Sequence, residues 1–128
     1  MLKLSSSSPT QKSGKHYEVL ALKYFKQQGL QLLEKNFNCR CGEIDLILKD
    51  HNSLVFAEVR FRKSTNYGSA AETVNYHKQQ KLIKAAQFFL LKHRHYESFP
   101  CRFDVLGISL GKEKNTIDYH WLKNAFQC

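Results

Sequence analysis

The chain has 128 residues, 42% hydrophobic and 12% aromatic, which is enough for one hydrophobic core and requires no second domain. Its formal charge of +9 favours a polyanionic partner such as nucleic acid over a merely basic surface. No apolar run approaches the roughly 20 residues that cross a bilayer, and the N-terminal MLKLSSSSPTQKSGK lacks the hydrophobic region of a secretory signal. We therefore expect a soluble, cytoplasmic protein with no membrane partner.

Cysteine and histidine spacing argues against a zinc site. The chain has no C-x-x-C pair, and its six histidines show no H-E-x-x-H or similar pattern. Reduced thiols are the expected state of the four cysteines, Cys39, Cys41, Cys101 and Cys128.

The first predicted element is a helix. Residues 1–12, rich in Ser and Lys with a Pro, are expected to form a flexible tail. A helix is predicted from Ser13 to Gly29, because apolar side chains recur at helical spacing and a glycine follows them. These apolar residues are Val19, Leu20, Leu22, Tyr24 and Phe25.

Three strands are predicted next, at residues 30–37, 42–49 and 53–62. The last two form an antiparallel hairpin, because Asp50, His51 and Asn52 between them have a turn composition. Residues 63–74 have no clear period and contain a glycine, so a mobile loop is expected there.

A second helix is predicted over residues 75–93, with one apolar face formed by Leu82, Ala86, Phe89 and Leu90. Strands at 101–110 and 116–121 follow, and residues 122–128 are predicted as a frayed helix. The order α-β-β-β-α-β-β indicates one α/β domain, residues 13–128, with a mixed sheet flanked by helices.

The hairpin gathers charged side chains. Because side chains alternate across a strand, Glu43 and Asp45 share one face. The opposite face receives Ile44, Leu46 and Leu48. On the partner strand Glu58, Arg60 and Arg62 share a face, so pairing places acids and arginines in one patch.

Both helices add to this patch. Glu18 lies at the edge of the inward face of the first helix, since Ala21, Leu22 and Phe25 follow it at helical spacing. Lys78 begins the apolar face of the second helix, which directs it to the sheet, and Gln79 lies beside it.

Four gathered acids, Glu18, Glu43, Asp45 and Glu58, favour a divalent cation such as Mg²⁺ or Mn²⁺. Such an ion supports phosphodiester hydrolysis by polarising a phosphoryl oxygen and activating water. The alternative is a solvated sheet face without metal, held by ion pairs Glu58–Arg60, Glu43–Arg62 and Asp45–Lys78.

The motifs GEIDLI, FAEVRFR, YGSAAETV with KQQKL, and CRFDVLGI together resemble the YraN-like family of largely uncharacterised bacterial proteins. The resemblance extends over residues 14–126. That family is similar in fold to Holliday-junction resolvases and restriction endonucleases of the PD-(D/E)xK class. The resemblance therefore implies a restriction-endonuclease-like fold and a homodimer.

The class pattern assigns Asp45 as the motif aspartate, Glu58 as the second acid and Glu18 as the extra ligand on the first helix. Arg60 stands where the class most often has lysine. Arginine stays protonated, so it can clamp a phosphate but cannot act as a general base. Lys78 is a hypothetical substitute for that lysine.

The expected function is metal-dependent cleavage of structured or single-stranded DNA, with DNA favoured over RNA. Asp45, Glu58, Arg60 and Lys78 are the catalytic candidates. The nucleic-acid-binding candidates are Arg60, Arg62, Lys63, Tyr67, Lys78 and Gln79. The alternatives are a nucleic-acid-binding module without turnover and an interaction protein whose acidic patch is structural. Asp104, between apolar neighbours, is interpreted as structural, paired with Arg102 or His77.

Overall fold

The computed structural model describes residues 9–62, 74–113 and 115–127. In chain order its elements are α1 (Pro9–Gln27), β2 (Gln31–Cys39), β3 (Gly42–Asp50), β4 (Ser53–Arg62), α2 (Tyr76–Lys92), the short 3-10 helix η2 (Arg94–Tyr96), β5 (Cys101–Leu110) and β6 (Ile117–Phe126). Residues 63–73 of the expected loop, which include Lys63 and Tyr67, lie outside the described part, and so does the side chain of Arg62.

The strands form one sheet in the order β2-β3-β4-β5-β6. Neighbouring strands are antiparallel except β4 and β5, which are parallel. A parallel pair requires a crossover connection, and here the connection contains α2. The predicted α/β class, the mixed sheet and the order of elements are confirmed.

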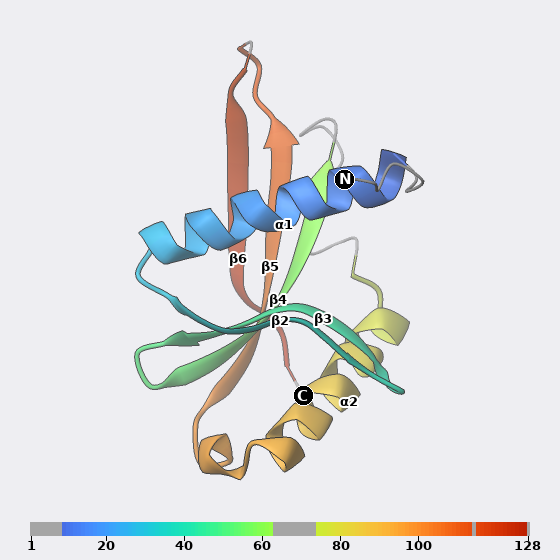
Figure 1. The fold of residues 1–128 in the computed structure, drawn as a ribbon, viewed down its shortest axis with the longest axis vertical. Coiled ribbons are helices and arrows are strands. Elements are labelled where there is room, and N and C mark those ends of the chain that lie inside the picture. The colour runs from blue at the N-terminus through green and yellow to red at the C-terminus, as the bar shows by residue number, and fades with distance from the viewer. Residues whose placement is uncertain (1–8, 63–73, 114, 128) are drawn as a thin grey trace.

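The two helices cover opposite faces of the sheet, and β4 shows this through consecutive residues. Val55 packs in one core with Phe25 of α1, whereas Phe56 packs in the other core with Phe89 of α2. Figure 1 shows α1 crossing in front of β4, β5 and β6. Burial of each such side chain contributes roughly 1.5–3 kcal/mol, so β4 is fixed from both sides.

Helix α1 begins at Pro9 rather than at the expected Ser13, and it ends where the glycine signal predicted. Gly29 has φ +94°, its N–H donates to Lys26 O at 3.0 Å, and Leu30 N–H donates to Phe25 O at 3.0 Å. This is a Schellman motif, which satisfies carbonyls at the helix end.

Helix α2 has a side-chain cap at its first turn. The Asn75 side chain accepts a hydrogen bond from Lys78 N at 2.8 Å, as N-cap residues commonly do. The apolar face expected from the sequence is confirmed, with Leu82, Ala86 and Phe89 buried against the sheet.

The predicted last helix is wrong, because residues 122–126 continue β6. Leu122 pairs with Val105, and Phe126 pairs with Phe103 with the two rings stacked at 4.9 Å. Leu, Lys and Ala in LKNAF are compatible with a helix, but pairing with β5 and ring stacking outweigh that local preference.

Asp104 ties β5 to β6, which confirms its structural interpretation. The buried carboxylate accepts bonds from Arg102 Nε at 3.1 and 3.2 Å, Trp121 Nε1 at 2.9 Å and Asn124 N at 2.9 Å. Arg102 Nη2 also donates to Asp50 Oδ2 at 2.8 Å. A buried carboxyl group with this many donors has its hydrogen-bonding capacity satisfied.

The described helices, α1, α2 and η2, include no segment long and apolar enough to cross a membrane.

Candidate functional site

The site lies where the β3–β4 hairpin stops pairing. Regular pairing runs from Asp50 opposite Ser53 to Leu46 opposite Ala57. Beyond that point Val59 N donates to the side chain of Asp45 at 2.9 Å instead. The carboxylate thus substitutes for a main-chain acceptor, which fixes its position between the two strands.

The alternation expected along β3 fails at Asp45. Leu46 and Leu48 lie in the core beneath α1, as one face requires, but Ile44 lies in the core beneath α2. The expectation that all three share a face is therefore wrong. Opposite Asp45, β2 carries Asn36, whose φ of +53° lies in the left-handed region.

Alternation along β4 is confirmed at the site. Glu58 follows Phe56 on the face covered by α2, and its side chain is only 6% exposed. Arg60 Nη2 lies 3.2 Å from Glu58 Oε2, and Lys78 Nζ of α2 lies 3.6 Å from the same oxygen. The predicted Glu58, Arg60 and Lys78 therefore form one cluster.

The Glu58 carboxyl group is strongly perturbed. Its pKa is raised from 4.5 to about 7, first by burial and then by repulsion from the Asp45 carboxylate and a hydrogen bond with it. Lys78 and Arg60 lower the pKa but do not cancel these effects. Asp45 and Glu58 therefore lie next to each other at this point of the hairpin.

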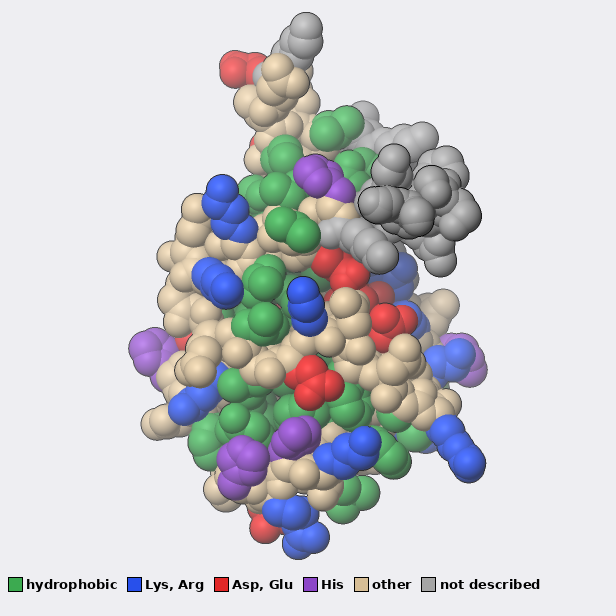
Figure 2. Space-filling model, viewed as in Figure 1, with side chains coloured by type: hydrophobic (Ala, Val, Ile, Leu, Met, Phe, Trp, Pro, Cys, Tyr) green, Lys and Arg blue, Asp and Glu red, His purple; other side chains and the backbone are tan. Residues whose placement is uncertain are grey.

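Glu18 reaches the same region from α1. Burial is the largest of the effects that raise its pKa, and the nearby carboxylates of Asp45 and Glu43 raise it as well. Glu18 thus interacts with Asp45 and Glu43, and Asp45 interacts in turn with Glu58. Figure 2 shows acidic side chains gathered on this face, between the regions of α1 and α2.

The gathered acids do not form a preassembled metal cage. Across residues 9–62, 74–113 and 115–127, no group of three or more His, Cys, Asp or Glu side chains could hold a metal ion. Mg²⁺ commonly uses only one or two protein carboxylates, with waters and substrate phosphates completing its shell. Asp45 and Glu58 fit that smaller set, because their carboxyl groups share a hydrogen bond.

Gln79 and Arg60, two of the predicted nucleic-acid-binding residues, differ in whether their side-chain N–H groups are free to bind a ligand. Gln79 Nε2 donates to Val74 O at 2.9 Å, so this amide nitrogen supports the start of α2. Arg60 Nε is buried and has no hydrogen-bond partner within the described part of the chain. A buried N–H group without a hydrogen-bond partner costs free energy. Arg60 Nε can therefore donate a hydrogen bond to an anionic ligand.

Asn36 is a site residue that the sequence reading missed. With its amide nitrogen facing α1, it donates to Glu18 Oε2 at 2.7 Å and Oε1 at 3.3 Å. The possible signal was an asparagine inside a strand pattern, since Asn adopts left-handed backbone more readily than most residues. Asn36 therefore positions the Glu18 carboxylate toward β3.

Replacing Asn36 by Gly is expected to raise the pKa of Glu18, because the Asn36 bond lowers it in the native protein. Glycine retains the left-handed backbone, whereas Asn36→Ala adds a backbone cost of roughly 1–2 kcal/mol. Carboxyl NMR titration without metal measures the pKa. Asn38→Ala, at an exposed position of the same strand, is the control. An unchanged Glu18 pKa in a folded Asn36→Gly variant would contradict the role of Asn36.

Residues 17–108 match the model of the uncharacterised protein family UPF0102. The chain is 49% identical over 121 residues to a UPF0102 protein of Stutzerimonas stutzeri, an alignment that covers 94% of this chain and 98% of that protein. It is 49% identical over 114 residues to one of Alcanivorax borkumensis, with coverage of 89% and 90%. A UPF0102 protein of Legionella pneumophila is 47% identical over 117 residues, with coverage of 91% and 96%. The chain therefore belongs to the UPF0102 family, which is the YraN-like family that its motifs indicated.

Proposed function

We propose that this protein is a metal-dependent endonuclease that hydrolyses phosphodiester bonds in structured or single-stranded DNA. The observation that carries the proposal is the pair of carboxyl groups at Asp45 and Glu58. They share a hydrogen bond at the point where the hairpin opens, and the pKa of Glu58 is raised to about 7. Perturbed acids of this kind are typical of functional sites.

Asp45 and Glu58 would hold Mg²⁺ or Mn²⁺, and Glu18 and Glu43, which interact with each other electrostatically, would bind its water ligands. A bound cation would relieve the repulsion that raises the pKa values of Glu18 and Glu58. When bound, the ion supplies polarisation of a phosphoryl oxygen and activation of water.

Arg60 and Lys78 bring the positive charge that a phosphate needs. Arg60 of β4 contacts Glu58 at 3.2 Å, and Lys78 of α2 contacts it at 3.6 Å. Arg60 is always protonated and therefore binds phosphate oxygens without acting as a base. Lys78, on a flexible stem, can exchange Glu58 for a phosphate oxygen when a substrate arrives. The formal charge of +9 attracts that substrate over longer distances.

A homodimer is part of this proposal. It follows from the resemblance to resolvase-like nucleases, which work as homodimers.

A second candidate is a nucleic-acid-binding module without turnover. It is favoured by the contacts of Glu58 with Arg60 and Lys78, which bring positive charge to the buried acid without a metal ion. In that case the same two cations would bind phosphate, and the acids would only hold them in place.

The two candidates are separated by measuring cation binding and cleavage together. Calorimetry with Mg²⁺ and Mn²⁺, and assays on single-stranded, branched and fully paired DNA, would compare wild type with Glu58→Gln. Glu97→Gln is the control, because Glu97 is exposed and pairs with Arg94 away from the site. The nuclease proposal expects cleavage that Glu58→Gln abolishes and Glu97→Gln retains. DNA binding without cleavage under either cation would establish the second candidate, and absence of DNA binding would exclude both.

A further inference from the structure

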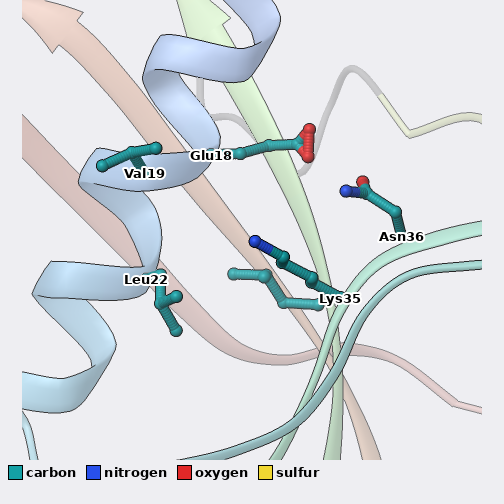
Figure 3. Close-up of a pocket in the computed structure, with 6 residues that line it drawn as sticks. Glu18, Val19, Leu22, Lys35 and Asn36 are labelled. Atoms are coloured by element: carbon teal, nitrogen blue, oxygen red, sulfur yellow. The ribbon is translucent and has the colours of Figure 1, made fainter.

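A pocket of about 250 Å³ lies beside the acids, between α1 and β2. Its lining residues are Glu18, Val19, Leu22, Lys35, Asn36 and Leu46. Figure 3 shows Glu18 and Asn36 facing each other across it, with Lys35 extending from β2 toward α1. Pockets for drug-sized ligands typically span roughly 300–1,000 Å³, so this smaller pocket suits a single ring system.

The pocket walls are of two kinds. Val19, Leu22 and Leu46 are apolar, and Val19 remains 66% exposed although it is a large hydrophobic side chain. Lys35 supplies a positive charge that interacts electrostatically with Glu18, although it forms no ion pair within 4.0 Å of any residue that the structure describes. An apolar wall next to a cation on a flexible stem matches a flat base joined to a phosphate.

The pocket is continuous with the proposed catalytic site, because Glu18 belongs to both. On one side Glu18 interacts electrostatically with Asp45 and Glu43, and on the other it lines the pocket with Lys35 and Asn36. A ligand in the pocket would therefore lie next to the position at which a phosphate meets Asp45.

We propose that the pocket receives one unpaired nucleobase of the DNA strand, with its phosphate on Lys35, next to the bond that is cleaved. The apolar side chains of α1 and β3 contact the base, and Asn36 limits the depth to which it enters. This inference rests on the proposed function, since it defines the substrate of the same site.

An unpaired base is required because of duplex geometry. A base stacked and paired within a duplex cannot reach a side pocket unless it is flipped out, which costs a few kcal/mol. Single-stranded segments, bulges and branch points present bases without that cost. The pocket therefore selects DNA with an unpaired nucleotide over fully paired duplex.

The inference is tested with oligonucleotides that carry 2-aminopurine, a base whose fluorescence reports its surroundings. The probe is placed at successive positions of a duplex with one unpaired nucleotide, and the full-length protein is added in EDTA so that no cleavage occurs. We expect a fluorescence change when the probe is the unpaired base, and none when the same probe is paired in an intact duplex.

Two variants with matched chemistry locate the binding site. Val19→Asp places a negative charge at the pocket, whereas Leu91→Asp places the same charge on α2 at a similarly exposed position, 68% against 66%. Val19→Asp is expected to weaken binding of the unpaired-base probe roughly tenfold, and Leu91→Asp to leave it within about twofold. Lys35→Gln is expected to weaken it too, with Lys26→Gln as the control. Circular dichroism checks that each variant is folded.

Failure of this inference is distinguishable from failure of the proposed function. If wild type cleaves DNA but no probe position changes its fluorescence, the pocket assignment is wrong and the nuclease proposal stands. If the probe responds at the unpaired position but no cation supports cleavage, the pocket assignment is retained and the nuclease proposal is wrong. Equal weakening by Val19→Asp and Leu91→Asp, or no DNA binding by wild type, overturns the inference.

Discussion

Replacing Asp45 by Asn is expected to abolish stoichiometric binding of Mg²⁺ or Mn²⁺ and to reduce DNA cleavage at least about 100-fold. Loss of a residue that merely supports a metal ligand commonly costs 10–100-fold, and Asp45 is proposed as a ligand itself. The same substitution should lower the pKa of Glu58, because repulsion by Asp45 and the hydrogen bond with it both raise that pKa.

The Asp45→Asn variant should remain folded, so a loss of cation binding or cleavage would not result from unfolding. The amide oxygen of Asn can still accept the bond from Val59 N, so the hairpin opening retains its geometry. Calorimetry measures cation binding, an oligonucleotide assay measures cleavage, and carboxyl NMR measures the pKa of Glu58. Asp118→Asn, at an exposed position of β6, is the control. An unchanged Glu58 pKa would contradict the described contact, and unchanged cleavage would contradict the nuclease proposal.

The second prediction is that the metal-free protein loses stability as pH rises from about 4.5 to about 7. Folding raises the pKa of Glu58 from 4.5 to about 7, so the folded state holds its proton more tightly than the unfolded state. The stabilisation is fully present below pH 4.5 and is lost as pH rises through the folded value. At 1.36 kcal/mol per pKa unit, this corresponds to a loss on the order of 3 kcal/mol.

Burial sets the sign of this effect, because it is the largest influence on the pKa of Glu58. Among the charged groups that face Glu58, Asp45 opposes ionisation, whereas Arg60 and Lys78 support it. Urea unfolding at successive pH values in EDTA measures the free energy of unfolding. In Glu58→Gln the decrease between pH 4.5 and 7 should be smaller, with only the part that the raised pKa of Glu18 contributes remaining, and Glu97→Gln should behave as wild type. A wild-type stability that increases over this range, relative to Glu58→Gln, would show that the cations dominate instead.

Mg²⁺ provides a further check on the same measurement. A ligand that binds only the folded state stabilises it by RT ln(1 + [L]/Kd). Added Mg²⁺ should therefore restore stability at pH 8 in wild type and not in Glu58→Gln. The pH dependence alone does not require a metal, so this step separates the acid pair from its proposed cation.

The strand and helix patterns accounted for most of the fold. Period-two alternation placed Glu58 and Arg60 on the face covered by α2, and helical spacing placed Lys78 opposite them, where the ion pairs form. Gly29 ended α1 as predicted, because only its positive φ allows the Schellman motif. These predictions succeeded because each depends on local geometry that a few neighbouring residues determine.

The failures share a different cause. Residues 122–126 have helix-compatible side chains but form β6, because Phe126 finds Phe103 across the sheet. Ile44 changes face because Asp45 binds Val59 N and Asn36 adopts left-handed backbone. Neither partner can be inferred from the residues next to it in sequence, since each lies on another strand.

The order of elements, the family and the four acids with their two neighbouring cations could all be predicted from the sequence. Which of these side chains contact one another became clear only from the packing of the strands and helices. Asp45 and Glu58 share a hydrogen bond, Glu58 takes both cations, and Asn36 holds Glu18. The physical reason is that alternation and helical period fix the direction of a side chain, whereas its pKa and its partners depend on burial and on distances between strands that only packing sets.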